Sequence, residues 1–142
     1  MLGVSNERIL HLPIIAQIFS ETLCYYGNRH NLHGVLGWGH KPTADKARRY
    51  AAKHGLPYIA LEDGFLRSLD LGCKGAQPLS LVVDHTGIYY DATEPSDLEN
   101  LLNGEGWESE TMLQSAQHAI EAIKRHELSK YNHAPHAAGN LL

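Results

Sequence analysis

Residues 34–61, GVLGWGHKPTADKARRYAAKHGLPYIAL, decide the fold class of this chain. The stretch begins with a short apolar segment, residues 34–39, which ends in glycines and is typical of a buried strand. A helix is expected next, because Thr43 can cap its first turn and Gly55 can end it in the left-handed conformation. Residues 56–61 then have the apolar composition of a second buried strand. Strand, helix and strand in about thirty residues form a βαβ unit, whose two strands run parallel.

The segments on either side of this unit predict a wider sheet with flanking helices. Apolar spacing, glycines and capping residues predict a helix over 14–20, strands over 22–27, 79–84 and 87–91, and helices over 95–104 and 107–132. The sequence HTG joins the last two strands as a tight turn. The long final helix has an apolar stripe that is expected to face the core: Leu113, Ala116, Ile120 and Ile123.

These elements predict an α/β fold class, a Rossmann-like parallel sheet with flanking helices. We expect one domain over residues 1–135. Residues 136–142 lack any periodicity and are expected to form a disordered tail.

Composition and charge argue against several classes of protein. The chain has 142 residues and a formal net charge of −4 at pH 7, and its basic residues form no run, so nucleic acid is not an expected partner. No stretch is long and apolar enough to span a bilayer, and the first ten residues lack the pattern of a secretory signal. Cys24 and Cys73 form no disulfide framework, which indicates a cytosolic protein. His30 and His33 lie close together without a Cys or acidic partner, so no metal site is predicted.

The segment LEDGFLRS, residues 61–68, follows the second parallel strand and holds two adjacent carboxylates. Ligands of open α/β sheets bind at the carboxyl edge of the strands, where this segment is expected to lie. One interpretation is structural: Glu62 pairs with Arg67, and Asp63 caps the turn at Gly64. The other is chemical: Asp63 is a nucleophile or general base in a cleft. Gly64 then lets a ligand approach the backbone, and Arg67 binds an anionic group.

The first strand of the βαβ unit ends in GWGHK and opens on the same edge of the sheet. Trp38 is either a packed side chain or a flat surface beside a ligand, where Lys41 could supply charge. The stretch is not a G-x-G-x-x-G fingerprint, and no acidic residue follows at the distance that binds a ribose, so NAD is not predicted. Tyr89 and Tyr90 are interpreted as a strand pair, with one side chain on each face of the sheet.

Two longer stretches carry a resemblance to a known family. Residues 35–72 contain G-W-G-x-K-P and E-D-G-F-L-R-S, and residues 78–102 contain G-I-Y-Y-D. With these motifs, the chain from about Leu10 to Pro135 resembles the capsule polysaccharide export and biosynthesis family of Gram-negative bacteria. Members of this family look like retaining β-Kdo transferases. They move 3-deoxy-manno-octulosonic acid (Kdo) from CMP-Kdo onto a lipid-linked acceptor at the base of a capsule.

The resemblance implies roles for individual residues. In similar CMP-sugar transferases the second acid of an acidic-acidic-glycine motif does the chemistry, so Asp63 is the expected nucleophile, forming a covalent Kdo–enzyme intermediate. Arg67 then lies near the carboxylate of Kdo, and Glu62 orients the loop. Further candidates for substrate contact are Glu62, Gly64, Trp38, Lys41 and Asn132. No metal or other cofactor is implied beyond the donor substrate CMP-Kdo.

The resemblance also implies that this chain is one half of a GT-B-type glycosyltransferase. The half that grips the CMP phosphates is expected to be a separate C-terminal half-module, divided from this one by a truncated or frameshifted reading frame or by dissection of the gene. CMP-Kdo and a lipid-linked Kdo acceptor are the expected ligands. The expected location is the cytoplasm, and peripheral association with the inner membrane or a capsule complex stays open. The alternative function is a non-catalytic module of the capsule export machinery, which binds glycolipid and transfers no sugar.

Overall fold

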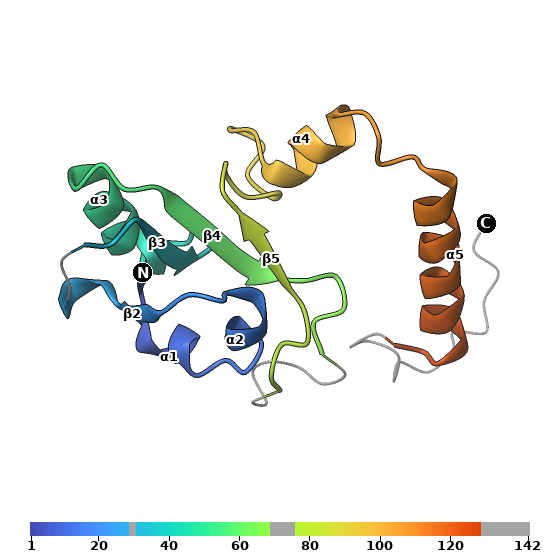
Figure 1. Ribbon diagram of the computed structural model, residues 1–142, viewed down its shortest axis with the longest axis horizontal. Helices are drawn as coiled ribbons and strands as arrows, with labels where there is room; N and C mark the ends of the chain where they lie inside the picture. Colours follow the sequence, from blue (N-terminus) through green and yellow to red (C-terminus); the bar gives the residue numbers. More distant parts are fainter. Residues whose placement is uncertain (29–30, 69–75, 129–142) are drawn as a thin grey trace, which may run out of the picture.

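A single sheet lies at the centre of the fold. The computed structural model describes residues 1–28, 31–68 and 76–128 (Figure 1). Within them the strand order is β2-β1-β3-β4-β5, with bounds β1 Leu2–Val4, β2 Leu23–Tyr25, β3 Gly34–Trp38, β4 Tyr58–Asp63 and β5 Leu81–Asp84. The helices of these residues are α1 Glu7–Leu10, α2 Ile15–Ile18, α3 Asp45–Lys53, α4 Asp97–Asn103 and α5 Glu110–Arg125, with 3₁₀ turns η1 Tyr26–Asn28 and η2 Pro42–Ala44.

The strands are parallel except for β5 at the edge. β1 pairs in parallel with β2 and β3, and β3 pairs in parallel with β4, which places Leu36 opposite Ile59. β5 pairs with β4 in the antiparallel sense. The predicted α/β class and the predicted βαβ unit are therefore confirmed. The interior strand β1, which lies between β2 and β3, was not predicted, because three residues are too few to show a period.

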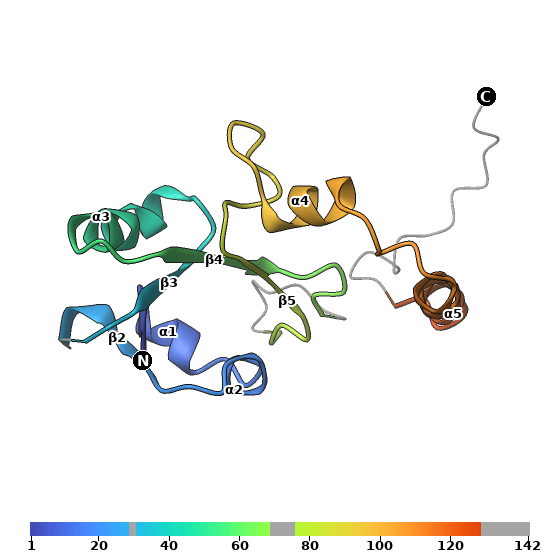
Figure 2. The same ribbon diagram turned by 45° about the horizontal axis from the view of Figure 1, so that its top comes forward.

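Helices cover both faces of the sheet (Figure 2). On one face, α1 and α2 enclose a core cluster formed by Leu2, Val4, Ile9, Ile15, Leu36, Ile59 and Leu61. On the opposite face, Ala47 and Ala51 of α3 pack against Val35 of β3. Neighbouring strand residues such as Val35 and Leu36 point to opposite faces, which is why the short apolar run of β3 serves both layers.

The βαβ unit differs from its prediction at two boundaries. The turn η2 precedes α3, and Ala44 occupies the N-cap position without a side-chain hydrogen bond, so Thr43 does not cap the helix. The helix ends at Lys53, and Gly55, which follows the C-cap residue His54, takes the predicted left-handed conformation with a φ of 63°. β4 extends further than predicted, so Glu62 and Asp63 are the last two residues of the strand.

The prediction of a strand over 87–91 is wrong. β5 ends at Asp84, whose buried carboxylate accepts hydrogen bonds from three backbone N–H groups, those of Thr86, Gly87 and Asp97. These bonds turn the chain away from the sheet. Ile88 is buried in the fold, while the side chain of Tyr90 is 45% exposed. GIYYD therefore forms a loop in which Gly87 and Ile88 are buried, not a strand.

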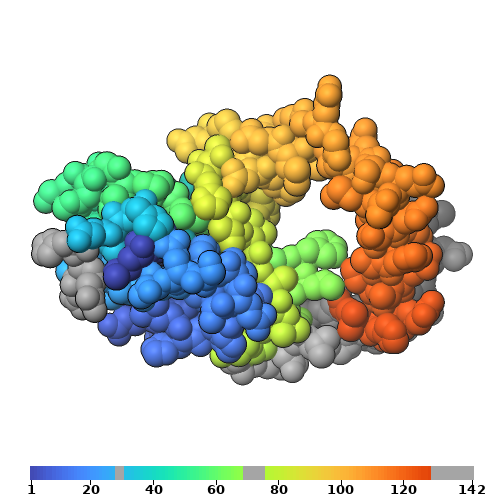
Figure 3. Space-filling model, in the orientation of Figure 1, coloured from blue at the N-terminus to red at the C-terminus, as the bar shows by residue number. Residues whose placement is uncertain are grey.

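The last two helices leave the sheet as an arm, residues 97–125 (Figures 1 and 3). α4 begins at the predicted cap Ser96, whose Oγ accepts a hydrogen bond from the N–H of Glu99, and it ends at Gly104. Neither α4 nor α5 contains a buried residue. The prediction that the apolar stripe of α5 faces the core is therefore wrong. Figure 3 shows open space between α5 and the sheet.

Candidate functional site

The carboxyl ends of β1, β3 and β4 border a cavity of about 390 Å³ at one edge of the sheet. This is the edge at which ligands of open α/β sheets bind. Polar side chains in its lining are Ser5 and Asn6 from the turn after β1, Arg8 from α1, Thr43 from η2, and Arg67 from the segment after β4. Trp38, Ile9 and Leu12 add apolar surface. Two arginines beside apolar surface suit an anionic ligand that also carries uncharged groups.

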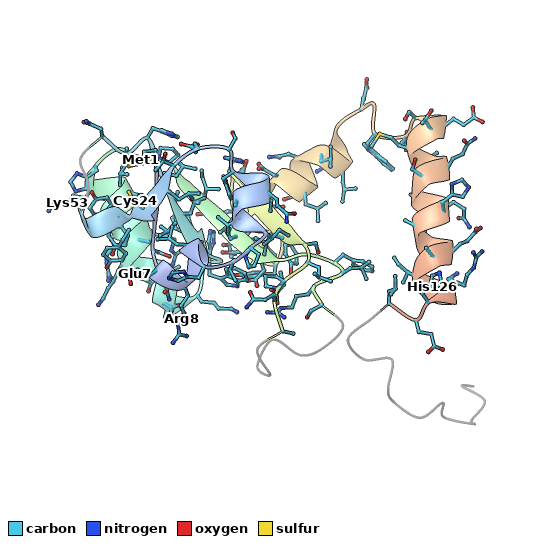
Figure 4. The ribbon with its side chains drawn as sticks, turned by 60° about the horizontal axis from the view of Figure 1, so that its bottom comes forward. Met1, Glu7, Arg8, Cys24, Lys53 and His126 are labelled. Carbon is cyan, nitrogen blue, oxygen red and sulfur yellow. The ribbon has the colours of Figure 1, made fainter. Side chains whose placement is uncertain are left out.

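Arg8 is a lining residue that the sequence analysis missed. It lies in the short helix α1 (Figure 4), and its backbone N–H donates to Oδ1 of the N-cap residue Asn6 over 2.9 Å. The signal that could have found it is the order of residue types in LGVSNERIL. An apolar triplet is followed by Ser and Asn, which are turn and cap formers.

Glu62 is buried at the end of β4, with 8% of its surface exposed. Its Oε1 accepts hydrogen bonds from Nε1 of Trp38 at 2.9 Å and from the backbone N–H of Asp63 at 3.1 Å. Its Oε2 is buried and has no hydrogen-bond partner in the parts of the chain that the structure describes. Glu62 therefore fixes the indole that lines the cavity and keeps one oxygen unmatched.

Asp63 pairs with Arg67, which corrects the structural interpretation of LEDGFLRS. Its Oδ2 accepts a hydrogen bond from Nε of Arg67 at 2.7 Å. Nη1 of Arg67 donates to the hydroxyl of Ser68 and the carbonyl of Ala76, so the guanidinium is held on two sides. Glu62 does not pair with Arg67. Oδ1 of Asp63 is buried and also lacks a partner among the described residues, a costly state that calls for an explanation.

The connection from β3 to α3 is fixed by the GIYYD segment. The hydroxyl of Tyr90 accepts the backbone N–H of His40 at 2.9 Å, and Oδ2 of Asp91 lies 3.2 Å from Nδ1 of His40. From the other side, the hydroxyl of Tyr58 donates to the carbonyl of Gly39 at 2.8 Å. Burial raises the pKa of Tyr58, so this hydroxyl keeps its proton. The two motifs GWGH and GIYYD thus form one cluster, which the interpretation of Tyr90 as a strand residue missed.

The other predicted site residues take different positions. Lys41 is exposed and does not line the cavity. A side chain on Gly64 would meet Oγ of Ser80 at 2.2 Å, so this glycine is required by packing within the fold. Asn132 lies outside the described residues. Substrate contact by these three residues stays a prediction.

No group of three or more His, Cys, Asp or Glu side chains in residues 1–28, 31–68 and 76–128 could hold a metal ion. Over the same ranges, no helix has both the length and the apolar character needed to cross a bilayer.

Comparison with known proteins gives the family. Residues 33–142, most of the chain, match the family described as capsule polysaccharide biosynthesis protein. This chain belongs to that family. It is 60% identical over 134 residues to the capsule polysaccharide modification protein LipA of Neisseria meningitidis serogroup B, which covers 93% of this chain and 19% of the relative. LipA of serogroup A is 47% identical over 133 residues, covering 93% of this chain and 19% of that relative.

A solved structure extends the likeness of this capsule-family chain to three dimensions. KpsC of Thermosulfurimonas dismutans, a beta Kdo 2,4 transferase, superposes with a TM-score of 0.82 and 45% sequence identity. The match covers 98% of this chain and 44% of that one. The chain thus spans about a fifth of the length of the two LipA relatives, 19% of each, and less than half of the solved transferase.

Proposed function

We propose that this chain is the acceptor-side part of a retaining β-Kdo transferase and that Asp63 is its nucleophile. The observation that carries the proposal is the buried Oδ1 of Asp63, which no described residue hydrogen-bonds, beside Arg67 at the carboxyl end of a parallel strand. Such a carboxylate oxygen keeps its lone pairs available for an electrophilic carbon, once the substrate displaces the atoms that bury it. The likeness to a beta Kdo 2,4 transferase supplies the substrate class.

The proposed reaction has two displacement steps. In the first, an oxygen of Asp63 attacks the anomeric carbon of Kdo, the bond from that carbon to the phosphate oxygen breaks, and CMP leaves. In the second, a hydroxyl oxygen of the acceptor attacks the same carbon and the bond to Asp63 breaks. The hydroxyl proton passes to a base. Each step inverts the configuration, so the two together retain it.

The neighbouring side chains then have distinct tasks. Nε of Arg67 orients the carboxylate of Asp63, and Arg8 and Arg67 give the cavity the positive charge that a sugar acid requires. Trp38, held by Glu62, offers a flat surface to a sugar ring. The unmatched Oε2 of Glu62 can accept a proton or a hydroxyl hydrogen bond.

The proposal includes a partner and a location. The CMP group would be held by a C-terminal half-module, as in a GT-B-type enzyme, because a cleft of that kind needs two walls. A lipid-linked acceptor places the reaction at the cytoplasmic face of the inner membrane. Neither of the two proposed displacement steps requires a metal ion.

The test uses a chimera in which the matched 134 residues of serogroup B LipA are replaced by this chain. The chimera is given CMP-Kdo and a synthetic lipid-linked Kdo acceptor, and Kdo transfer and CMP release are measured. Asp63→Asn should lower transfer by about 10³-fold or more, as expected for loss of a nucleophile. Asp45→Asn, which changes a surface acid paired with Arg48, should leave transfer unchanged.

Two outcomes would overturn the proposal. Full activity of the Asp63→Asn chimera would remove Asp63 from the chemistry. Binding of the acceptor by the chimera without any release of CMP would favour the alternative, a glycolipid-binding module of the capsule export machinery.

A further inference from the structure

Helix α5 presents an apolar face that no described residue covers. Six residues form this face, which we call the α5 face: Met112, Leu113, Ala116, Ala119, Ile120 and Ile123. Met112 is 55% exposed, Leu113 52% and Ile120 44%. The side chains of α5 extend into open space in Figure 4, where no other helix or strand stands beside them. A monomer rarely leaves such a contiguous apolar surface without a function.

The pattern of α5 indicates a buried helix. The apolar residues recur three and four positions apart, whereas Gln114, His118 and Glu121 lie on the opposite side. Helices shorter than about 12–15 residues are marginal in water, and most helical stability in proteins comes from packing of the apolar face. The 16 residues of α5 are barely longer than this limit and have no packing partner among the described residues. The helix therefore requires a partner surface.

Another exposed apolar side chain borders the same open space. The segment that follows β4 points toward the arm in Figures 1 and 3. Phe65 belongs to this segment and is 93% exposed. A partner that fills the space between the sheet and α5 would cover both surfaces.

The charges of α5 argue against a membrane as the partner. Glu110 and Glu121 balance Lys124 and Arg125, so the helix has no excess of positive charge. Helices that lie on membranes carry Lys and Arg along their polar face, and Gln, Ser and His occupy that face here.

The length of the solved transferase points to the partner. Its fold matches 98% of this chain with a TM-score of 0.82, so the likeness includes the arm. This chain accounts for only 44% of that chain, and the remainder is available to cover the arm. We infer that the α5 face is the docking surface for the remainder of a longer capsule-family polypeptide, which lies between α5 and the sheet. The inference rests on the proposed function only in taking this chain to work as part of a larger protein.

The experiment compares hydrogen exchange in α5 between the isolated chain and the LipA chimera. Backbone amides of a helix without a packing partner open and exchange readily, whereas docking protects them. In the chimera, the amides of residues 112–123 should exchange at least about tenfold more slowly than in the isolated chain. Equal exchange rates would overturn the inference.

A matched pair of variants locates the surface. Leu113→Glu with Ile120→Glu adds two negative charges to the α5 face, and Gln114→Glu with His118→Glu adds two on the opposite side of the helix. The first pair should abolish the protection of α5 in the chimera, and the second pair should keep it. Loss of protection in both variants, or in neither, would contradict the assignment of the face.

The remaining controls distinguish other partners. Hydrogen exchange of the isolated chain is measured without additions and again with vesicles of anionic phospholipid. Light scattering gives the mass of the isolated chain in solution. Protection of α5 in a dimer of the isolated chain would show that a second copy is the partner, and protection only with vesicles would show a membrane. Either result would overturn the inference. The exchange readout does not depend on Kdo transfer, so a protected but inactive chimera would contradict the proposed function and leave the docking surface intact.

Discussion

Glu62 and Asp63 are neighbours in sequence, but the strand gives them different partners. Side chains alternate along β4, so Glu62 binds Trp38 while Asp63 binds Arg67. Each carboxylate keeps one buried oxygen without a partner among the described residues. The pair is therefore not a dyad that shares a proton. Glu62 orients the indole that lines the cavity, and Arg67 orients the carboxylate of Asp63.

Replacement of Glu62 tests its structural task. In Glu62→Leu, the indole N–H of Trp38 and the backbone N–H of Asp63 lose their acceptor. A buried donor left unmatched costs about 1–3 kcal/mol, so the free energy of unfolding should fall by that amount. Glu62→Gln keeps an acceptor oxygen and should cost less. Urea unfolding followed by circular dichroism measures both, and equal losses would contradict the bonding described for Trp38.

Asp91 makes the stability of the fold sensitive to acid. Hydrogen bonds from the hydroxyl of Thr93, the ring of His40 and the backbone of Thr93 lower the pKa of Asp91 to about 2. Because this pKa lies below its usual value of 3.8, the folded state favours the ionised carboxylate. The stabilisation is complete above the usual pKa and is lost as the pH falls toward 2.

The corresponding variant is Asp91→Asn. It removes the titrating group, so part of the loss of thermal stability between about pH 4 and pH 2 should disappear. Thermal unfolding at a series of pH values checks this. An unchanged pH profile for the variant would show that other carboxylates account for the acid sensitivity.

Among the elements, β3, α3 and β4 could be predicted because each has a clear local signal: an apolar run, a capping glycine, a second apolar run. The strand over 87–91 was predicted wrongly because Asp84 closes the loop through contacts that the local pattern does not show. The stripe of α5 was predicted correctly as an amphipathic pattern. A periodic pattern does not say which surface will cover it, and the described residues do not cover it.

Part of the candidate site could also be predicted from local sequence signals. Asp63, Glu62 and Arg67 lie in one sequence segment at the end of a predicted parallel strand, so their position at the sheet edge could be inferred. Arg8 and Tyr90 reach the same edge only through folding of segments far apart in the chain. No spacing within the sequence connects them.

Two glycines with positive φ provide a test of the cluster around Tyr90. Gly39 has a φ of 54° and Gly55 a φ of 63°. A Cβ at Gly39 would lie 2.1 Å from the hydroxyl oxygen of Tyr90, whereas a Cβ at Gly55 would meet nothing within 4 Å. Gly55→Ala should therefore cost only the left-handed strain of about 1–2 kcal/mol. Gly39→Ala should cost more, because Tyr90 must move away from His40. Thermal unfolding of the two variants measures the difference, and equal costs would show that the cluster adds nothing to stability.

The whole molecule joins a packed sheet to an arm without a core of its own. The sheet and the helices packed on it contain buried apolar residues and the candidate site. Helices α4 and α5 contain no buried residue. The similar transferase chain is more than twice as long, since this chain covers 44% of it, and we propose that the remainder of such a chain covers the arm. We therefore expect catalysis only from a polypeptide in which the arm is covered.

The most direct test of Asp63 as the nucleophile is intact-mass spectrometry of the LipA chimera incubated with CMP-Kdo and no acceptor. We predict an increase in mass by one Kdo unit. Mass analysis of the peptides after digestion should locate this unit in the peptide that contains Asp63. The added mass should be absent from the Asp63→Asn chimera and should disappear when acceptor is supplied. A Kdo adduct that persists in Asp63→Asn, or that maps to a different residue, would contradict the assignment.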